Sequence, residues 1–336
     1  MSISTQANAM KPSLMIEAIN SLAKIRQPAF IWGPPGVGKS QIVKQVADDL
    51  EIDMIDIRAL HLDPVDLRGL PYLAEDKRAG WATPDFLPTE GKGILFLDEL
   101  NAAPPLVQAA CYQLTLDRKI GEYMLPDGWS VMAAGNRETD RAVTSKMPSA
   151  LANRFIHLDF VVDLDDWCDW ALKNDLVTEL IAFLRFRPEL LHQFDPKSGD
   201  RAFPTPRSWE FVSNTLKSGV KQEVEFPILS GTVGEGAAAE LEGFLRIFRN
   251  LPSVEGILMD PKGTEVPEDP ATLYALAGSL ARRADDANFA QIKIYSDRLP
   301  AAFGVLLVSD AVKRTPAIQK TRPFINWATE NSSVVL

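Results

Sequence analysis

Apolar runs alternate with amphipathic segments through the first half of the chain. Apolar or alternating runs predict strands at residues 28–32, 54–58, 93–97, 129–134 and 155–160. Helical spacing of apolar residues predicts helices at 12–25, 41–50 and 104–116. The run from Gly93 to Leu97 is apolar throughout, which is typical of a strand buried on both faces. Strands that alternate with helices predict an α/β fold, a three-layer structure with a central parallel sheet.

The pattern becomes all-helical from about residue 163. Helices are predicted at 163–173, 176–187, 208–217, 237–249, 270–283, 288–297 and 301–312, with a Pro- and Gly-rich loop or linker at 251–270. We therefore divide the chain into an α/β core (1–162), a helical region (163–250) and a C-terminal helical extension (251–336). Within the core, residues 60–91 have weak periodicity and form an insert, and 117–128 predict a hairpin closed by Asp127-Gly128.

Composition narrows the class of protein. The chain has 336 residues, 46% of them hydrophobic, which is enough to bury a full core. Its net charge of −10 disfavours non-specific nucleic-acid binding. Two cysteines without a CxxC pair fit a reducing compartment, and both are expected in the core. Three scattered histidines predict no zinc site, and no signal peptide or membrane-spanning run is found. We expect a cytoplasmic protein that has no membrane partner.

The segment between the first predicted strand and its helix carries the strongest chemical signal. It reads Gly33-Pro34-Pro35-Gly36-Val37-Gly38-Lys39-Ser40, which fits the pattern G-x-x-x-x-G-K-[ST], with Gln41 next along the helix. Glycines bring backbone N–H groups close to a phosphate, and the helix N-terminus favours the negative charge. Lys39 adds a point charge near the β- and γ-phosphates, and the Ser40 hydroxyl can bind Mg²⁺. The strand–loop–helix context predicts binding of ATP with Mg²⁺.

Two carboxylates follow the apolar strand at 93–97. Asp98 and Glu99 are expected at the carboxyl edge of the sheet, beside the phosphate-binding segment. In isolation, two acids at a strand end are more often solvated caps. Together with the glycine-rich segment, Asp98 is suited to hold Mg²⁺ and Glu99 to polarise an attacking water. Asn136, at the end of the next strand, is a weaker candidate for contact with the γ-phosphate or that water.

These motifs, with Ala150-Leu151-Ala152-Asn153-Arg154-Phe155 and Pro204-Thr205-Pro206-Arg207, resemble the AAA+ ATPases. The hairpin before the Asn136 strand, the 150–155 segment and the insert segment 62–71 resemble the MoxR branch of that superfamily, whose relatives include the CbbQ and NorQ activases. The resemblance covers residues 12 to about 215. It implies an AAA+ core followed by a helical lid over the nucleotide.

The resemblance also implies roles for particular residues. Asn136 corresponds to the sensor-1 residue, Arg154 to the arginine finger that reaches a neighbouring subunit, and Arg207 to sensor 2 on the lid. Catalytic candidates are thus Glu99, Asn136, Arg154 and Arg207; Arg137 and Arg141 are alternative contacts for the finger role. The insert, which carries Trp81 and Phe86, is either an irregular surface loop or an element that engages a partner.

The implied function is an ATP-hydrolysing ring, hexameric by resemblance, that remodels or activates a protein partner. In MoxR-type ATPases that partner has a von Willebrand factor A domain. Two alternatives stay open: a nucleic-acid motor or loader, and the ATPase subunit of a metal chelatase. The acidic balance argues against the motor, and the small basic cluster of Lys313, Arg314, Lys320 and Arg322 is expected to be a solvated patch.

Overall fold

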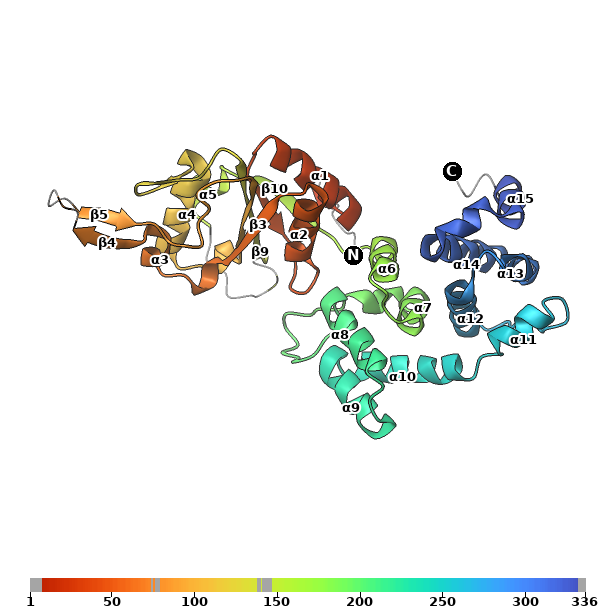
Figure 1. Cartoon of the computed structure of the whole chain (residues 1–336). Helices are drawn as coiled ribbons and strands as arrows, with labels where there is room; N and C mark the ends of the chain where they lie inside the picture. Colours follow the sequence, from red (N-terminus) through yellow and green to blue (C-terminus); the bar gives the residue numbers. More distant parts are fainter. Residues whose placement is uncertain (1–7, 74, 76–78, 138–139, 141–146, 332–336) are drawn as a thin grey trace. The chain divides into compact units, whose positions relative to one another are not determined.

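The chain forms two compact units (Figure 1). A computed structural model describes residues 8–73, 75, 79–137, 140 and 147–331. The first unit comprises Met1–Asp163 and Phe194–Gly199, and the second comprises Leu164–Gln193 and Asp200–Leu336. The first division falls beside the predicted end of the α/β core. The second unit contains residue 250, where we placed the boundary between two helical regions.

A parallel six-stranded sheet forms the centre of the first unit, and it confirms the predicted fold class. The strand order is β1-β10-β2-β9-β6-β3, and every neighbouring pair is parallel. Their bounds are β1 (Ala9–Met10), β2 (Ala29–Trp32), β3 (Asp53–Arg58), β6 (Gly93–Asp98), β9 (Trp129–Gly135) and β10 (Ile156–Phe160). Strand β1 was not predicted, because two residues carry no periodic signal.

Alternate residues of the central strands pack against helices on opposite faces of the sheet. Ile31, Phe96 and Met132 share a buried cluster with α1 (Pro12–Lys24) and α2 (Lys39–Asp49). Phe30, Leu95 and Val131 share another with α4 (Pro105–Asp117). Figure 1 shows α1 and α2 on one side of the sheet and α4 with α5 (Ser149–Ala152) on the other. Burial on both faces explains the continuous apolar runs of β6 and β9.

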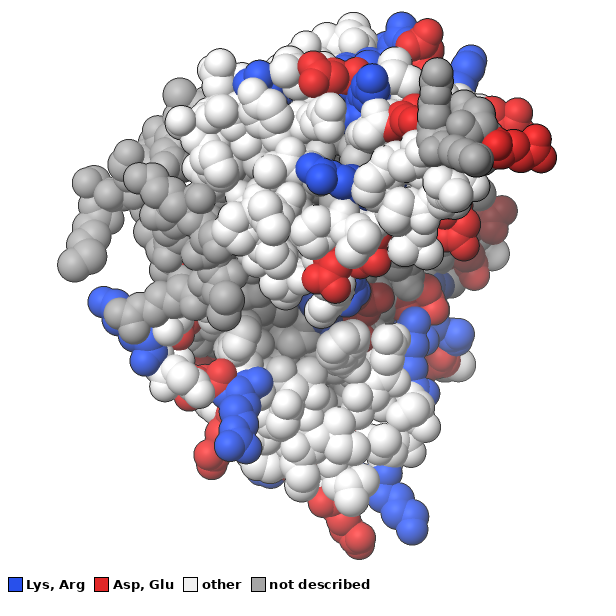
Figure 2. All heavy atoms as spheres, turned by 90° about the vertical axis from the view of Figure 1, so that its left-hand side faces the viewer, with Lys and Arg blue, Asp and Glu red and all other residues white. Residues whose placement is uncertain are grey.

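The predicted insert contains more regular structure than its sequence indicates. It holds the 3₁₀ turn η1 (Ala59–His61), α3 (Pro64–Arg68) and an antiparallel hairpin of β4 (Leu70–Leu73) and β5 (Ala79–Ala82). Leu70 is 68% exposed and Leu73 75% exposed. Figure 2 views the molecule from the end that bears this hairpin in Figure 1, and uncharged side chains cover most of the near surface. The hairpin therefore presents apolar side chains to solvent.

A second, small hairpin lies within 117–128, as predicted, but its turn is elsewhere. Strand β7 (Lys119–Ile120) pairs with β8 (Tyr123–Met124), so the turn is Gly121-Glu122. Gly121 has a φ of +57°, which glycine adopts without strain. The prediction of Asp127-Gly128 as the turn was wrong; these residues lie in the connection to β9, where Trp129 N–H donates to Pro126 O at 3.0 Å.

The second unit is all-helical. Its helices are α6 (Leu164–Lys173), α7 (Thr178–Phe186), α8 (Pro206–Lys217), α9 (Gln222–Val233), α10 (Glu235–Arg249), α11 (Val254–Met259), α12 (Pro270–Arg283), α13 (Phe289–Ser296), α14 (Ala301–Arg314) and α15 (Arg322–Glu330), with 3₁₀ turns η4 (Pro188–Leu191) and η5 (Pro316–Lys320). Helices α11 to α15 share one buried cluster. Arg185 on α7 donates to both carboxylate oxygens of Asp310 on α14, which joins the early and late helices.

Helices α9, α11 and α15 were not predicted. Pro227 lies inside α9 and removes one backbone donor, so the sequence looks like a break. Helix α11 occupies part of the predicted linker, whereas α12 has the predicted bounds.

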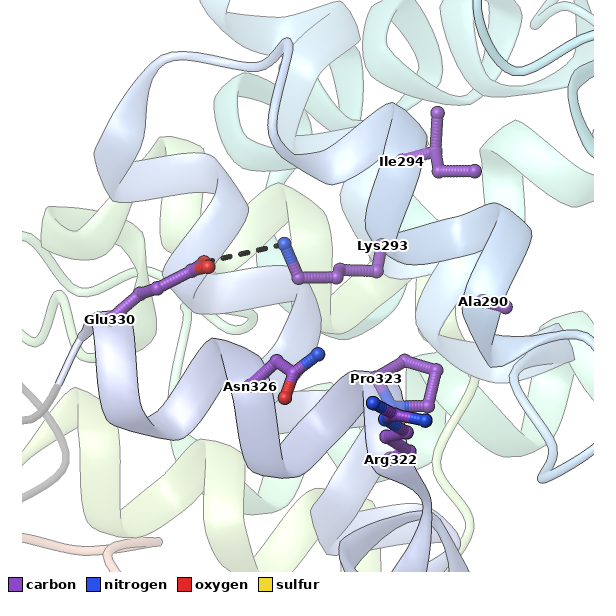
Figure 3. Close-up of a pocket in the computed structure, with 7 residues that line it drawn as sticks. All are labelled: Ala290, Lys293, Ile294, Arg322, Pro323, Asn326 and Glu330. Atoms are coloured by element: carbon purple, nitrogen blue, oxygen red, sulfur yellow. Dashed lines mark hydrogen bonds and ion pairs between the residues drawn. The ribbon is translucent and has the colours of Figure 1, made fainter.

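A shallow pocket of about 350 Å³ lies between α13 and α15 (Figure 3). Its Lys293 amine donates to Asp297 at 2.7 Å and to Glu330 at 3.4 Å.

Candidate nucleotide site

The phosphate loop (residues 33–40) joins β2 to α2 at the carboxyl edge of the sheet. Gly36 and Gly38 have φ values of +76° and +99°, a backbone conformation that side chains with a Cβ rarely adopt. A Cβ at Gly38 would meet nothing within 4 Å, so the loop borders open space there. The buried side chain of Val37 anchors the loop to the core. Since the first N–H groups of α2 have no partner within the helix, the loop can cradle an anion.

The Lys39 ammonium group lies over this loop. It donates to Gly33 O at 2.7 Å, to Pro34 O at 3.0 Å and to Asn136 Oδ1 at 2.9 Å. Asn136 directly follows β9, the neighbour of β2 in the sheet. The parallel sheet thus brings together two residues that are 97 positions apart in the sequence. The Lys39 ammonium group and the Asn136 amide, both predicted as site residues, are therefore in direct contact.

The two predicted carboxylates lie at the end of β6. Asp98 Oδ2 accepts a hydrogen bond from Ser40 Oγ at 3.0 Å, and Asp98 Oδ1 accepts one from Glu99 N–H at 2.9 Å. A hydroxyl and a carboxylate in contact are hard oxygen ligands of the kind that Mg²⁺ takes beside a nucleotide. The pKa of the Asp56 carboxyl on β3 is raised, mainly because the group is partly buried and also because Asp98 is negatively charged. A cation held by Ser40 and Asp98 would offset this negative charge.

Glu99 has an unusual backbone conformation. Its φ is +56° and its ψ 30°, the left-handed region that costs a non-glycine residue roughly 1–3 kcal/mol. The 3₁₀ turn η2 (Leu100–Ala102) follows, and Ala102 N–H donates to Glu99 O at 2.9 Å. The strained turn directs the chain out of the sheet directly after Asp98, at the edge where the phosphate loop lies. Arg26, Glu51, Arg118 and Asp175 have similar φ values, so this conformation alone does not mark a functional site.

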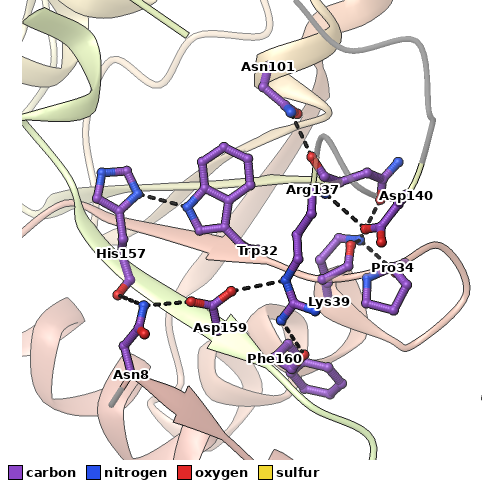
Figure 4. A network of polar contacts seen from close by, with 12 residues as sticks. Asn8, Trp32, Pro34, Lys39, Asn101, Arg137, Asp140, His157, Asp159 and Phe160 are labelled. Atoms are coloured by element: carbon purple, nitrogen blue, oxygen red, sulfur yellow. Dashed lines mark hydrogen bonds and ion pairs between the residues drawn. The ribbon is translucent and has the colours of Figure 1, made fainter. Parts of the chain in front are cut away.

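Arg137 follows Asn136 and is held within its own unit (Figure 4). Its Nε donates to Asp159 Oδ1 at 3.0 Å, and a terminal nitrogen donates to Phe160 O at 3.3 Å. Asp159 is buried and also accepts from Asn8 Nδ2 at 2.6 Å. The guanidinium group of Arg137 therefore joins the end of β9 to the end of β10. Arg141, the other alternative contact, lies outside the described residues.

Arg154 follows the short helix α5 and packs on α4. Its guanidinium carbon lies 4.0 Å from the centroid of the Tyr112 ring, a cation–π contact, and one terminal nitrogen donates to Ala150 O at 2.8 Å. Arg207 is the second residue of α8, which begins with a capping box formed by Thr205 and Ser208. Since Arg207 belongs to the second unit, its position over the nucleotide stays a prediction, as does the role of Arg154 in a neighbouring site.

Two contacts at this edge were missed by sequence reasoning. Asn101 Nδ2 donates to Asn136 O at 2.8 Å. Trp32 Nε1 donates to His157 Nδ1 at 2.8 Å, while His157 Nε2 lies 2.8 Å from Ala152 O. The Trp32 N–H can only donate, so His157 Nδ1 accepts in this contact. The only sequence signal for Asn101 was a polar residue two positions after Glu99.

Comparison with known proteins finds a family that is similar to part of the chain. Residues 29–157 match the profile of the family described as "ATPase family associated with various cellular activities (AAA)". The match spans β2 to β10 and includes the phosphate loop, the two carboxylates and Asn136. This segment, which is less than half of the chain, is similar to that family.

The solved structures that match this chain have low sequence identity to it. The Holliday junction branch migration motor RuvB of Thermotoga maritima is 16% identical, with coverage of 80% of each chain and a TM-score of 0.39. NtrX of Brucella abortus in complex with ADP is 14% identical, with a TM-score of 0.44, and covers all of this chain and 70% of its own. At these scores the likeness bears on neither function nor site. No curated protein matches the chain.

Within the described residues, no three His, Cys, Asp or Glu side chains are grouped so as to hold a metal ion by themselves. In the same part of the chain, no helix is long and apolar enough to cross a membrane.

Proposed function

We propose that this protein binds ATP with Mg²⁺ and hydrolyses it at the carboxyl edge of the sheet. One observation carries the proposal: Lys39 contacts Asn136 while the adjacent Ser40 contacts Asp98. Four residues from three separate chain segments thereby form the cation, amide, hydroxyl and carboxylate set that phosphoryl transfer to water requires. The AAA-family match over the same residues supports this assignment.

Each residue has a distinct task in this proposal. Lys39 exchanges its contacts with Gly33 O, Pro34 O and Asn136 Oδ1 for phosphate oxygens. Ser40 and Asp98 would hold Mg²⁺, which would supply positive charge beside the phosphate groups. Glu99 accepts a proton from the attacking water as general base. Asn136, released by Lys39, orients that water or the γ-phosphate.

The proposed active form is a ring, a hexamer by resemblance to the MoxR branch. Arg154 then acts on the γ-phosphate of a neighbouring subunit, and Arg207 acts from the lid on the nucleotide of its own subunit. An arginine delivered to the transferred phosphoryl group is worth roughly 10³-fold or more in rate. In the isolated chain Arg154 rests on Tyr112, and its Nε is buried without a hydrogen-bond partner among the described residues. A role in the assembly would therefore require the Arg154 side chain to leave its contact with Tyr112.

The proposed output is mechanical work on a protein partner, with a von Willebrand factor A-domain protein as the expected class. This part of the proposal rests on the resemblance alone. The β4–β5 hairpin, with its exposed Leu70 and Leu73, is the element of the first unit that we expect to respond to such a partner.

Assembly and shared catalysis are tested by the ATPase rate at increasing protein concentration, with molar mass measured by light scattering. Specific activity should rise steeply as an ATP-dependent ring forms. Arg154→Ala and Glu99→Gln subunits should be inactive alone but regain activity when mixed, because one ring then contains intact composite sites. Arg246→Ala, on an exposed face of α10, is the matched control and should behave as wild type. A monomer whose turnover is independent of concentration would contradict the shared site.

A further inference from the structure

The spacing between Glu99 and Asn136 is not set by the sheet. Strands β6 and β9 pair as far as Leu97 and Ala133, and both residues lie beyond that last pair. Past the end of the ladder, Asn101 joins the two segments: its Nδ2 donates to Asn136 O at 2.8 Å (Figure 4). This contact links the turn that carries Glu99 to the backbone of Asn136.

The Asn101 side chain is enclosed and its orientation is determined. Asn101 is 2% exposed. Only the NH₂ group can face Asn136 O, because an amide oxygen there would oppose another oxygen. The Asn101 Oδ1 is buried and has no hydrogen-bond partner among the described residues. A buried acceptor without a partner lowers stability, so this residue is not optimised for stability alone.

The chain opposite Asn101 is shaped to receive it. A Cβ on Gly135 would lie 2.0 Å from Asn101 Oδ1 and 2.9 Å from Phe30 Cζ. Glycine at 135 therefore leaves the space that the amide fills. The same short segment is held from the other side, where Gly33 N–H donates to Gly135 O at 3.2 Å and Lys39 donates to Asn136 Oδ1. Residues 135–136 are thus clamped between the phosphate loop and the Glu99 turn.

We infer that Asn101 is a positioning residue, which sets the distance between Glu99 and Asn136 across the site of water attack. The inference rests on the proposed function, since it assigns catalytic tasks to those two residues. Misplacement of a reacting group by about 1 Å can cost on the order of 100-fold in rate. Loss of the Asn101 donor should lower turnover while nucleotide affinity, which depends on the phosphate loop, is kept.

The test compares two buried amides. Asn101→Leu removes the donor and retains similar bulk. Gln108→Leu is the matched control: Gln108 is 1% exposed, donates to Ala103 O at 2.9 Å and likewise has a buried amide oxygen without a partner among the described residues. We expect Asn101→Leu to lower kcat roughly tenfold or more, with affinity for a fluorescent ADP analogue within about twofold of wild type. Gln108→Leu should retain wild-type kcat.

A second pair of variants distinguishes loss of turnover from loss of stability. Asn101→Ala opens space beside Gly135, so Gly135→Ala should destabilise the protein less in that background than alone, as thermal denaturation would show. The double variant should be more stable than the sum of the two single changes predicts, without recovering kcat. Equal kcat in Asn101→Leu and Gln108→Leu, or recovery of kcat in the double variant, would overturn the positioning role. Absence of turnover in the wild type would instead overturn the proposed function, and the inference with it.

Discussion

At the scale of single residues, Lys39 gives the most direct prediction on binding. Its ammonium group already faces three oxygens, so it is oriented before a phosphate arrives. Lys39→Ala should weaken ATP and ADP binding by roughly tenfold or more, because a charged contact to phosphate is lost. Titration with a fluorescent ADP analogue measures this. Lys44→Ala, on the exposed face of the same helix, should bind as wild type.

Tight binding by Lys39→Ala would contradict the assignment of the phosphate loop. The sequence predicts this loop because its motif specifies local backbone geometry, and its role in binding stays a prediction. The contact of Ser40 with Asp98 followed from the same motif logic, since parallel strands end at one edge. The clamp by Asn101 could not be predicted, because an isolated asparagine has no spacing rule that distinguishes it from a turn residue.

At the scale of elements, strands and helices with buried faces were easier to predict from the sequence than exposed ones. Strands β6 and β9 were located closely because both faces are covered and their runs are apolar. Helix α12 was predicted at its observed bounds because its apolar stripe is regular and Pro270 marks its start. The β4–β5 hairpin was missed because most of its side chains are exposed, so no alternation of buried and exposed positions marks it.

The hairpin offers a prediction about Gly69, which precedes β4. Gly69 has a φ of +81°, and a Cβ there would lie 1.8 Å from Ala82 O on the partner strand. Gly69→Ala should therefore disrupt the hairpin and speed amide hydrogen exchange over residues 70–73 and 79–82. Gly121→Ala is a matched control with a φ of +57° and no atom within 4 Å of the new Cβ. It should cost only backbone strain, about 1 kcal/mol. Unchanged exchange in Gly69→Ala would show that the hairpin tolerates the clash.

At the scale of the whole molecule, each unit has its own core and its own cysteine. Burial raises the pKa of Cys111 in the first unit and of Cys168 in the second to about 12, from 9.0. At pH 8 the thiolate fraction in the folded state is then about a thousandfold lower than in the unfolded chain. Alkylation by iodoacetamide, followed by mass spectrometry, should be slow for both until the unit unfolds. Rapid alkylation of either cysteine in the folded protein would contradict its burial.

Labelling during a denaturant titration would also show whether the two units unfold together. Two separate cores predict two midpoints, one for each cysteine, unless the units stabilise each other. Added ADP should raise the midpoint of Cys111, since a ligand stabilises the state that binds it. The change in periodicity predicts a boundary near residue 163, and the Pro- and Gly-rich segment 251–270 predicts a linker. The division of the chain into three parts stays a prediction.

The central claim is that the carboxyl edge of the sheet hydrolyses ATP. It is tested most directly by ATP turnover in the presence of Mg²⁺, measured side by side for wild type, Lys39→Ala and Glu99→Gln, with ADP affinity for each. The account predicts that wild type turns over ATP, that Lys39→Ala neither binds tightly nor turns over, and that Glu99→Gln binds normally but is roughly 100-fold slower or more. Near-normal turnover by Glu99→Gln, or no turnover by wild type at any concentration, would contradict it.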